Sequence, residues 1–181
     1  VSGLLLILQA VRGDNFQEFE SYISAICHDD QLMKKLFYFA SNAKTPLSIC
    51  TVAMDILRLL PKNIKECQHL IDGGFLPMML KITVHPNRDV RAHAVFALSL
   101  FSNHREFLNH VCVEPVVRSA LNGCNYDHGR VKDGFVKILG NLIAITVSSG
   151  DQEKANWLIN QTITDDKFSP IHAQCEAIKF E

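Results

Sequence analysis

The chain has 181 residues, of which 48% are hydrophobic and 20% charged, an ordinary composition for a folded protein with a sizeable core. Its formal net charge of -1 argues against a general polyanion binder, because nucleic-acid binding by counterion release needs clustered Lys and Arg. The six cysteines are scattered without a C-x-x-C pair, which favours reduced thiols in an intracellular protein, cytoplasmic or nuclear, over a disulfide framework. No stretch has the length and apolarity that a membrane span requires.

The spacing of apolar residues predicts short and long helices along the chain. In chain order we expect helices at 3–12, 15–27, 30–41, 49–60, 63–72, 75–84, 90–101, 104–111, 113–121 and 131–142, and the start of a further unit within 151–181. Two short helices therefore precede each long one.

Three of these segments align without a gap. They read ICTVAMDILRLL at 49–60, VRAHAVFALSLF at 90–101 and VKDGFVKILGNL at 131–142, so their starts are 41 residues apart. Apolar residues occupy positions i, i+4, i+7, i+8 and i+11 of every copy, which is one face of an α-helix. The pattern predicts three copies of one long helix with a common buried face.

Residues that end or begin helices support this division. Gly73-Gly74 lies between two short helices, where glycine can adopt the left-handed conformation that ends the first of them. Thr45-Pro46 is expected to cap the first long helix, with proline at its first position. Asn87 is the expected cap of the second copy and Asp127 of the third.

The motifs LIDGGFLPMMLKI at 70–82, VRAHAVFALSLFS at 90–102 and ILGNLIA at 138–144 resemble the armadillo repeat. HEAT repeats, which have two helices, are the near alternative, but Gly-Gly and the three-helix rhythm favour armadillo. The resemblance implies an all-α, right-handed superhelical solenoid of about four repeats of roughly 41 residues. We expect one domain over 1–181, divided as a partial repeat 1–12, repeats at about 14–60, 62–102 and 104–148, and a partial repeat 151–181.

In the armadillo family the third, long helix of each repeat lines a concave groove that binds an extended peptide or a partner helix. A family asparagine holds the ligand backbone, and a tryptophan one turn earlier forms pockets. Only Asn141 matches the asparagine here, and the other copies have Leu59 and Leu100. The tryptophan positions hold Asp55, Phe96 and Lys137, which departs from the pattern for basic peptides.

A row of side chains off the apolar face therefore forms the predicted partner-binding surface. Its members are Asp55, Leu59, Phe96, Leu100, Asp133, Lys137 and Asn141. Phe96 and Leu100 have two interpretations: they are buried under a neighbouring helix, or they form an exposed apolar patch that binds a partner.

The Cys and His residues give no recognisable reactive site. Cys67-x-His69 and Cys124-x-x-x-His128 are the tightest pairs, and neither has the paired spacing of a zinc site. No motif frames a nucleophile or a phosphate-binding loop. We expect no metal, no cofactor and no catalytic residue. The predicted loop 122–129 (NGCNYDHG) is interpreted as a tolerated insertion in preference to a contact point.

The main functional hypothesis is a non-catalytic scaffold or adaptor that binds a peptide or helix of a partner protein along the third helices. A second hypothesis is a small-molecule-sensing solenoid attached to a catalytic region, with a compact polar pocket around Lys137. A third is an enzyme with Cys/His chemistry. No nucleic-acid ligand is expected. The partner's identity and the oligomeric state are left open by the sequence.

Overall fold

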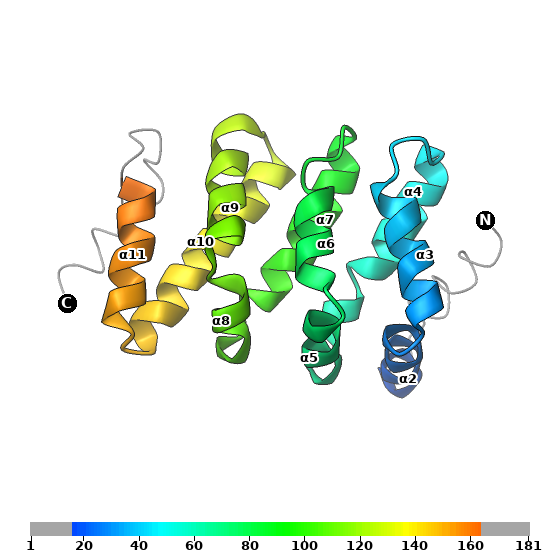
Figure 1. The fold of residues 1–181 in the computed structure, drawn as a ribbon, viewed down its shortest axis with the longest axis horizontal. Coiled ribbons are helices and arrows are strands. Elements are labelled where there is room, and N and C mark those ends of the chain that lie inside the picture. Colours follow the sequence, from blue (N-terminus) through cyan, green and yellow to red (C-terminus); the bar gives the residue numbers. More distant parts are fainter. Residues whose placement is uncertain (1–15, 164–181) are drawn as a thin grey trace. The chain divides into compact units, whose positions relative to one another are not determined.

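The computed structural model of the chain describes residues 16–163, which consist of helices joined by short connections (Figure 1). They fall into two compact units: unit 1 ends at Leu100 and unit 2 begins at Phe101, within the long helix α7. The predicted helix 3–12 and the part of 151–181 beyond residue 163 lie outside the described residues. The division into repeats at the predicted bounds stays a prediction.

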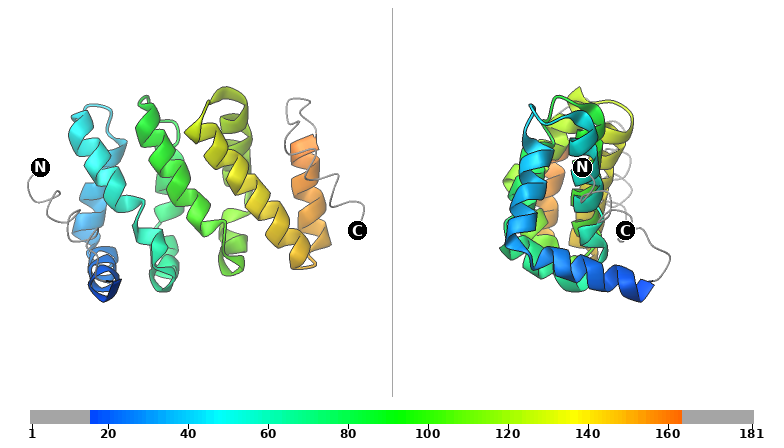
Figure 2. Two further views of the ribbon diagram at one scale, coloured as in Figure 1. Left: turned by 180° about the vertical axis from the view of Figure 1, so that it is seen from behind. Right: turned by 90° about the vertical axis from the view of Figure 1, so that its right-hand side faces the viewer.

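The described part of unit 1, from residue 16, contains six complete helices and most of a seventh. These are α2 (Phe16–Cys27), α3 (Asp30–Ser41), α4 (Leu47–Leu57), η1 (Leu60–Lys62), α5 (Ile64–Asp72), α6 (Phe75–Ile82) and α7 (Arg88–Phe101). Helix α3 packs against α4 and α6, and α2 packs against α5. Figure 1 shows α3 and α6 in front of α4 and α7, and the view from behind in Figure 2 shows α4 and α7 in front. The short-short-long order predicted from the sequence is confirmed for α5, α6 and α7, with 9, 8 and 14 residues, but α4 has 11 residues and is not longer than α2 and α3, with 12 each.

The apolar columns of the sequence form the cores of the two units. In α4 and α7 every column residue is buried except Ile49, which is half-buried, and in α10 (Arg130–Ser148) all five are buried. Burial of each large apolar side chain contributes about 1.5–3 kcal/mol of hydrophobic free energy. The predicted common face of the three long helices is therefore their packing face.

Helix α4 is shorter than predicted. It ends at Leu57, and a 3-10 turn follows at Leu60–Lys62. Pro61 has no N–H to donate to the Leu57 carbonyl four residues earlier, and its ring collides with that carbonyl in an α-helix. Proline therefore ends the helix, and the predicted end at residue 60 is wrong.

Two of the expected helix boundaries in unit 1 are confirmed and one is wrong. Asn87 Oδ1 accepts hydrogen bonds from the N–H groups of Asp89 (2.9 Å) and Val90 (3.2 Å), as a cap of α7 should. Gly74 has φ +79°, the left-handed conformation expected between α5 and α6. The Thr45 side chain does not cap α4, because Pro46 occupies the cap position and provides no side-chain hydrogen bond.

Up to residue 163, unit 2 contains the end of α7 and five further helical segments. These are η2 (Arg105–Phe107), α8 (Leu108–Val111), α9 (Glu114–Tyr126), α10 (Arg130–Ser148) and α11 (Gln152–Ile163). Helix α10 packs against α8, α9 and α11, and it lies in front of α8 and α9 in the view from behind (Figure 2). It extends to Ser148, beyond the predicted end at residue 142.

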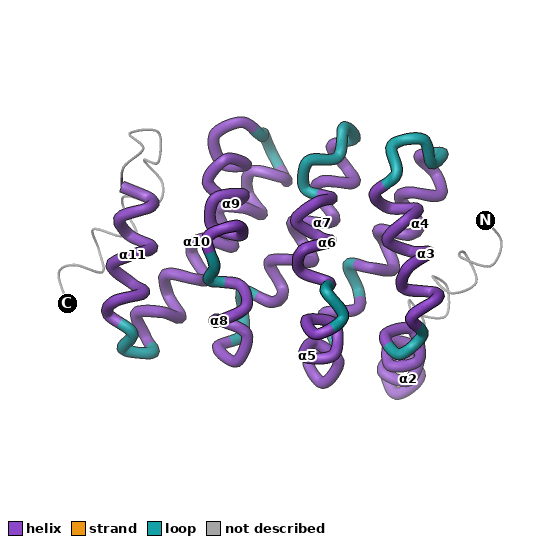
Figure 3. The backbone as a smooth tube through the Cα atoms, in the orientation of Figure 1, coloured by secondary structure: helices purple, strands orange, loops and turns teal. Residues whose placement is uncertain are grey.

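The predicted loop 122–129 is mostly helix. Helix α9 continues to Tyr126, and only a short connection remains before α10 (Figure 3). Gly123 stays helical because it is buried against α10: a Cβ atom at this position would overlap the ring of Phe135. Asp127 ends α9 and Gly129, with φ +54°, precedes α10, so Asp127 is not the cap of the third copy.

Candidate functional site

Polar side chains from α4 and α7 surround an exposed aromatic ring in unit 1. Asp55 lies near the end of α4, and Arg58 is the residue that follows its last turn. His93 and Phe96 lie three residues apart on α7, so they share one side of that helix. We call these four residues the α4–α7 cluster.

A chain of contacts joins the four residues. Arg58 Nε donates a hydrogen bond to Asp55 Oδ1 at 2.8 Å, and His93 Nδ1 lies 3.5 Å from the same oxygen. The Arg58 guanidinium carbon is 6.0 Å from the centre of the Phe96 ring, at the outer limit of a cation–π interaction. The i, i+3 spacing of Asp55 and Arg58 makes the first contact local, whereas the others connect two successive long helices.

The cluster is accessible to solvent. Side-chain exposure is 19% for Asp55, 26% for Arg58 and 30% for His93, and Phe96 is 39% exposed as a residue. Phe96 is therefore exposed and not buried under a neighbouring helix, and its contact with a partner stays a prediction. A large ring that is exposed beside charged groups offers both apolar area and polar anchors to a partner.

The two leucines predicted beside the cluster differ from the expectation. Leu59 is buried, with 6% exposure, in the turn between α4 and η1. Because α4 has already ended, Leu59 does not continue the row of Asp55, and it belongs to the core. Leu100, on α7 one turn after Phe96, is half-buried.

The corresponding row of unit 2 lies on α10. Asp133 and Lys137 are exposed, and Asn141 is half-buried. Asn141 Nδ2 donates hydrogen bonds to Ser102 Oγ at 3.0 Å and to Asn103 Oδ1 at 2.6 Å, in the turn that follows α7. Both amide hydrogens are thus used within the unit, and the side-chain oxygen is the group left to accept a bond from a ligand N–H.

Sequence reasoning missed Arg58 and His93. The Asp55–Arg58 pair has the i, i+3 spacing of a helical ion pair, so this signal was present in the sequence. His93 gave no such signal, because its contact with Asp55 depends on how α4 and α7 pack. Ser102 and Asn103 were missed for the same reason.

The buried thiols are not reactive groups. Removal from water raises the pKa of Cys67 to about 12, with a further contribution from the Glu66 carboxylate, and burial raises the pKa of Cys124 to about 12. Cys27 lies beside a pair of stacked histidines: the rings of His28 and His69 are 4.3 Å apart, and His69 Nε2 donates to the Cys27 carbonyl at 3.0 Å.

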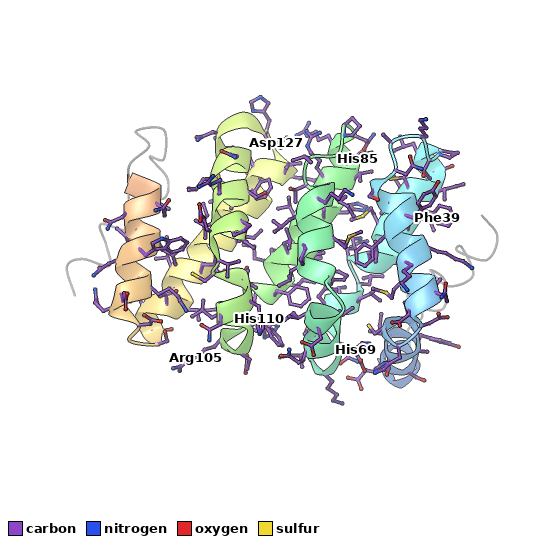
Figure 4. All side chains as sticks on the ribbon, viewed as in Figure 1. Phe39, His69, His85, Arg105, His110 and Asp127 are labelled. Atoms are coloured by element: carbon purple, nitrogen blue, oxygen red, sulfur yellow. The ribbon has the colours of Figure 1, made fainter. Side chains whose placement is uncertain are left out.

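The stacked pair joins two helices of unit 1. Figure 4 shows His69 on the side of α5 that faces α2. Among the described residues no group of three or more His, Cys, Asp and Glu side chains is arranged to hold a metal ion. No helix in the part that the structure describes is long and apolar enough to span a membrane.

Unit 2 has an open pocket of about 330 Å³ between the start of α9 and the first turns of α11. Its lining residues are Cys112, Glu114, Asp151, Glu153, Lys154 and Trp157. Lys154 is held by its own unit, because Nζ donates to Asn109 Oδ1 at 2.7 Å and lies 3.7 Å from Asp151 Oδ2. Lys137 does not line this pocket, so it is not the polar pocket that the small-molecule hypothesis predicted around Lys137.

Comparison with solved structures identifies the fold. An engineered protein superposes with a TM-score of 0.55 at 16% identity, covering 98% of this chain and 80% of its own. A computationally designed armadillo repeat protein for modular peptide recognition gives 0.57 at 13% identity, covering 98% and 81%. A designed armadillo repeat protein in complex with the peptide (KR)4 gives 0.53 at 14% identity, covering 90% and 75%.

The chain has an armadillo-like repeat fold. No protein-family model matches the sequence, and no curated protein matches it either. The armadillo resemblance read from the sequence is confirmed at the level of the all-α solenoid fold.

Proposed function

We propose that this armadillo-like chain is a non-catalytic scaffold that binds a peptide or helix of a partner protein. The α4–α7 cluster is the observation that carries the proposal, because it places an exposed ring beside an arginine and a carboxylate on two successive long helices. Phe96 supplies the apolar anchor, and Asp55 and Arg58 supply the polar contacts that orient a ligand.

The structural neighbours support the general class of function. Two of them are designed armadillo repeat proteins, one made for peptide recognition and one solved with a bound peptide. In this chain we assign the first contacts to the α4–α7 cluster and to Leu100. On α10, Asp133, Lys137 and the Asn141 oxygen form a second proposed contact row, and Leu59 is removed from the predicted set because it is buried.

Selection from a random-peptide display library tests the proposal. The chain is immobilised, enriched peptides are synthesised, and their affinities are measured by fluorescence anisotropy for the wild type and for Phe96→Ala. We expect Phe96→Ala to weaken the selected peptides by roughly tenfold, because a buried aromatic anchor contributes about 1–2 kcal/mol of binding free energy.

Tyr38→Ala is the matched control, since Tyr38 is an exposed aromatic residue on α3, away from the α4–α7 cluster. It should leave the affinities unchanged. Affinities that fall equally in both variants, or peptides that are never enriched, would contradict the proposal.

The pocket of unit 2 supports a second candidate, the binding of a small molecule. Its volume is at the lower end of the range for ligand pockets, and Trp157, the chain's only tryptophan, lines it. Tryptophan emission, excited at a wavelength that tyrosine does not absorb, therefore reports on the surroundings of this pocket. A metabolite panel that raises the melting temperature and changes Trp157 emission would favour the second candidate over the scaffold.

A further inference from the structure

We infer that Arg58 is a carboxylate receptor, so that the partner segment on the α4–α7 cluster is acidic and apolar, with an Asp or Glu side chain next to an apolar one. This inference rests on the proposed function and names the chemistry of its ligand. It depends on which hydrogen-bond donors of Arg58 are already used and on which remain accessible.

The guanidinium uses only one of its nitrogens within the described part of the chain. Nε donates to Asp55 Oδ1, and the two terminal nitrogens, Nη1 and Nη2, form no hydrogen bond with a described residue. Neither of them is among the buried polar atoms that lack a partner, so they are open to water. An arginine held at Nε keeps the end-on pair of parallel N–H donors, which matches the two oxygens of a carboxylate.

Asp55 orients the guanidinium before a ligand arrives. On α4 it accepts a hydrogen bond from Nε, and the Phe96 ring on α7 lies 6.0 Å from the guanidinium carbon, at the outer limit of a cation–π interaction. An arginine that is already oriented loses less side-chain entropy when it binds a carboxylate. The same ring remains 39% exposed, which places apolar area next to the charged donors.

The accessible donors favour a carboxylate over a basic side chain. The Asp55 carboxylate already accepts a hydrogen bond from Arg58 Nε and lies 3.5 Å from His93 Nδ1, so a lysine would compete with these neighbours for it, whereas a carboxylate can bind Nη1 and Nη2 of Arg58. A basic side chain would also meet the Arg58 guanidinium with the same sign of charge. The ligand chemistry is therefore the opposite of the (KR)4 peptide bound by the designed protein.

Three labelled peptides test the inference. Each has a central triplet between identical Gly-Ser flanks, and the triplets are Leu-Glu-Leu, Leu-Gln-Leu and Leu-Lys-Leu. We expect anisotropy titrations to show the Glu peptide bound about tenfold more tightly than the Gln peptide, with the Lys peptide weakest, because charge-assisted bidentate hydrogen bonds are about twice as strong as neutral ones.

Substitutions locate the preference on Arg58. Arg58→Gln should remove the difference between the Glu and Gln peptides, and Arg58→Lys should keep only part of it because a lysine lacks the two-pronged geometry. Phe96→Ala should weaken all three peptides by a similar factor. Circular dichroism melting curves verify that each variant is folded.

The possible outcomes separate the inference from the proposed function. Tighter binding of the Lys peptide, or equal binding of all three with a loss in Phe96→Ala, overturns the carboxylate receptor and leaves the peptide scaffold in place. A Glu preference that persists in Arg58→Gln also overturns the inference. If none of the three peptides binds, the inference and the proposed docking face fail together.

Discussion

The long helices α4 and α10 have the same apolar columns but differ at their carboxyl ends. Helix α4 has 11 residues and ends before Pro61, and the Arg58 side chain that follows it reaches Phe96 on α7. Helix α10 has 19 residues, and the side chain of Asn141 in its middle is bound to Ser102 and Asn103. In unit 1 the terminal nitrogens of Arg58 remain accessible to a ligand. In unit 2 the side-chain nitrogen of Asn141, the residue that matches the family asparagine, is already bound to Ser102 and Asn103.

A repeated apolar pattern therefore determines which face of each long helix packs, but it does not determine the face that is available to a ligand. The packing face depends on apolar side chains at helical spacing, and these recur in all copies. The opposite face depends on single polar residues and on where each helix ends, and these do not recur.

The largest expected effect is on the alkylation rate of the buried thiols, which should be equally slow in the two units. At pH 8 a pKa of about 12 for Cys67 and Cys124 gives a thiolate fraction roughly 1,000-fold below that of a thiol at the ordinary value of 9.0. Alkylation with iodoacetamide, located by mass spectrometry in Cys175→Ser, should therefore be slow at both residues. Rapid alkylation of one of them would show that its unit opens locally far more often.

The same thiols make stability depend on pH. Their folded pKa values lie above the unfolded value, so their contribution to the free energy of unfolding is complete below about pH 9 and is lost as the pH rises toward 12. Urea titrations at pH 8 and pH 10 should show lower stability at pH 10. Serine at both positions should reduce the loss of stability between pH 8 and pH 10, and the remainder comes in part from Cys27, Cys50 and Cys112, whose pKa values burial also raises.

Matched core truncations test whether the packing faces are equivalent. Ile56→Ala in α4 and Ile138→Ala in α10 remove fully buried side chains from the same column, and each should lower the free energy of unfolding by about 3 kcal/mol. Urea denaturation followed by circular dichroism measures both. Ile64 is exposed, so Ile64→Ala should change the free energy of unfolding by less than about 1 kcal/mol. A much smaller loss for Ile56→Ala would show that the shorter α4 packs less well.

Gly123→Ala should destabilise unit 2 by about 2 kcal/mol, because the added methyl group overlaps the Phe135 ring in a packed interface. The exposed neighbour Asn122→Ala is the control and should stay within about 0.5 kcal/mol. Phe135→Leu combined with Gly123→Ala should recover part of the loss, since a smaller side chain makes room. If the combined loss is the sum of the two single losses, the steric explanation fails.

The smallest effects compare the two polar rows directly. Asn141→Ala removes two hydrogen bonds and should lower the free energy of unfolding by about 1 kcal/mol. Asp55→Asn affects a partly exposed ion pair and should lower it by about 0.5 kcal/mol or less. The urea midpoints give both values. The reverse order would mean that the α4–α7 cluster stabilises the fold and that Asn141 is the residue available to a ligand.

The sequence predicted most of the fold because the fold depends on apolar spacing and helix signals. The columns of α4, α7 and α10, the Asn87 cap and the Gly74 turn all follow from local rules. Thr45 and Asp127 failed as caps, since Pro46 and Gly129 occupy the cap positions of α4 and α10. Gly123 was assigned to a loop because its tolerance in a helix depends on Phe135, a contact that local rules do not include.

The candidate site was less accessible to sequence reasoning. Asp55, Phe96 and Asn141 were found because they occupy the family's ligand positions. His93 was missed, since its contact with Asp55 requires the packing of two helices. Leu59 was assigned to the ligand row because the helix was expected to continue to residue 60, whereas α4 ends at Leu57.

The close approach at Gly123 also sets an order for the folding of unit 2. Gly123 and Phe135 are only twelve residues apart, whereas Ser102 and Asn141 are separated by 39. Short loops close with less loss of chain entropy, so the α9–α10 hairpin should form in the folding transition state before the asparagine contacts. Stopped-flow kinetics should then show that Gly123→Ala slows folding, while Asn141→Ala mainly speeds unfolding.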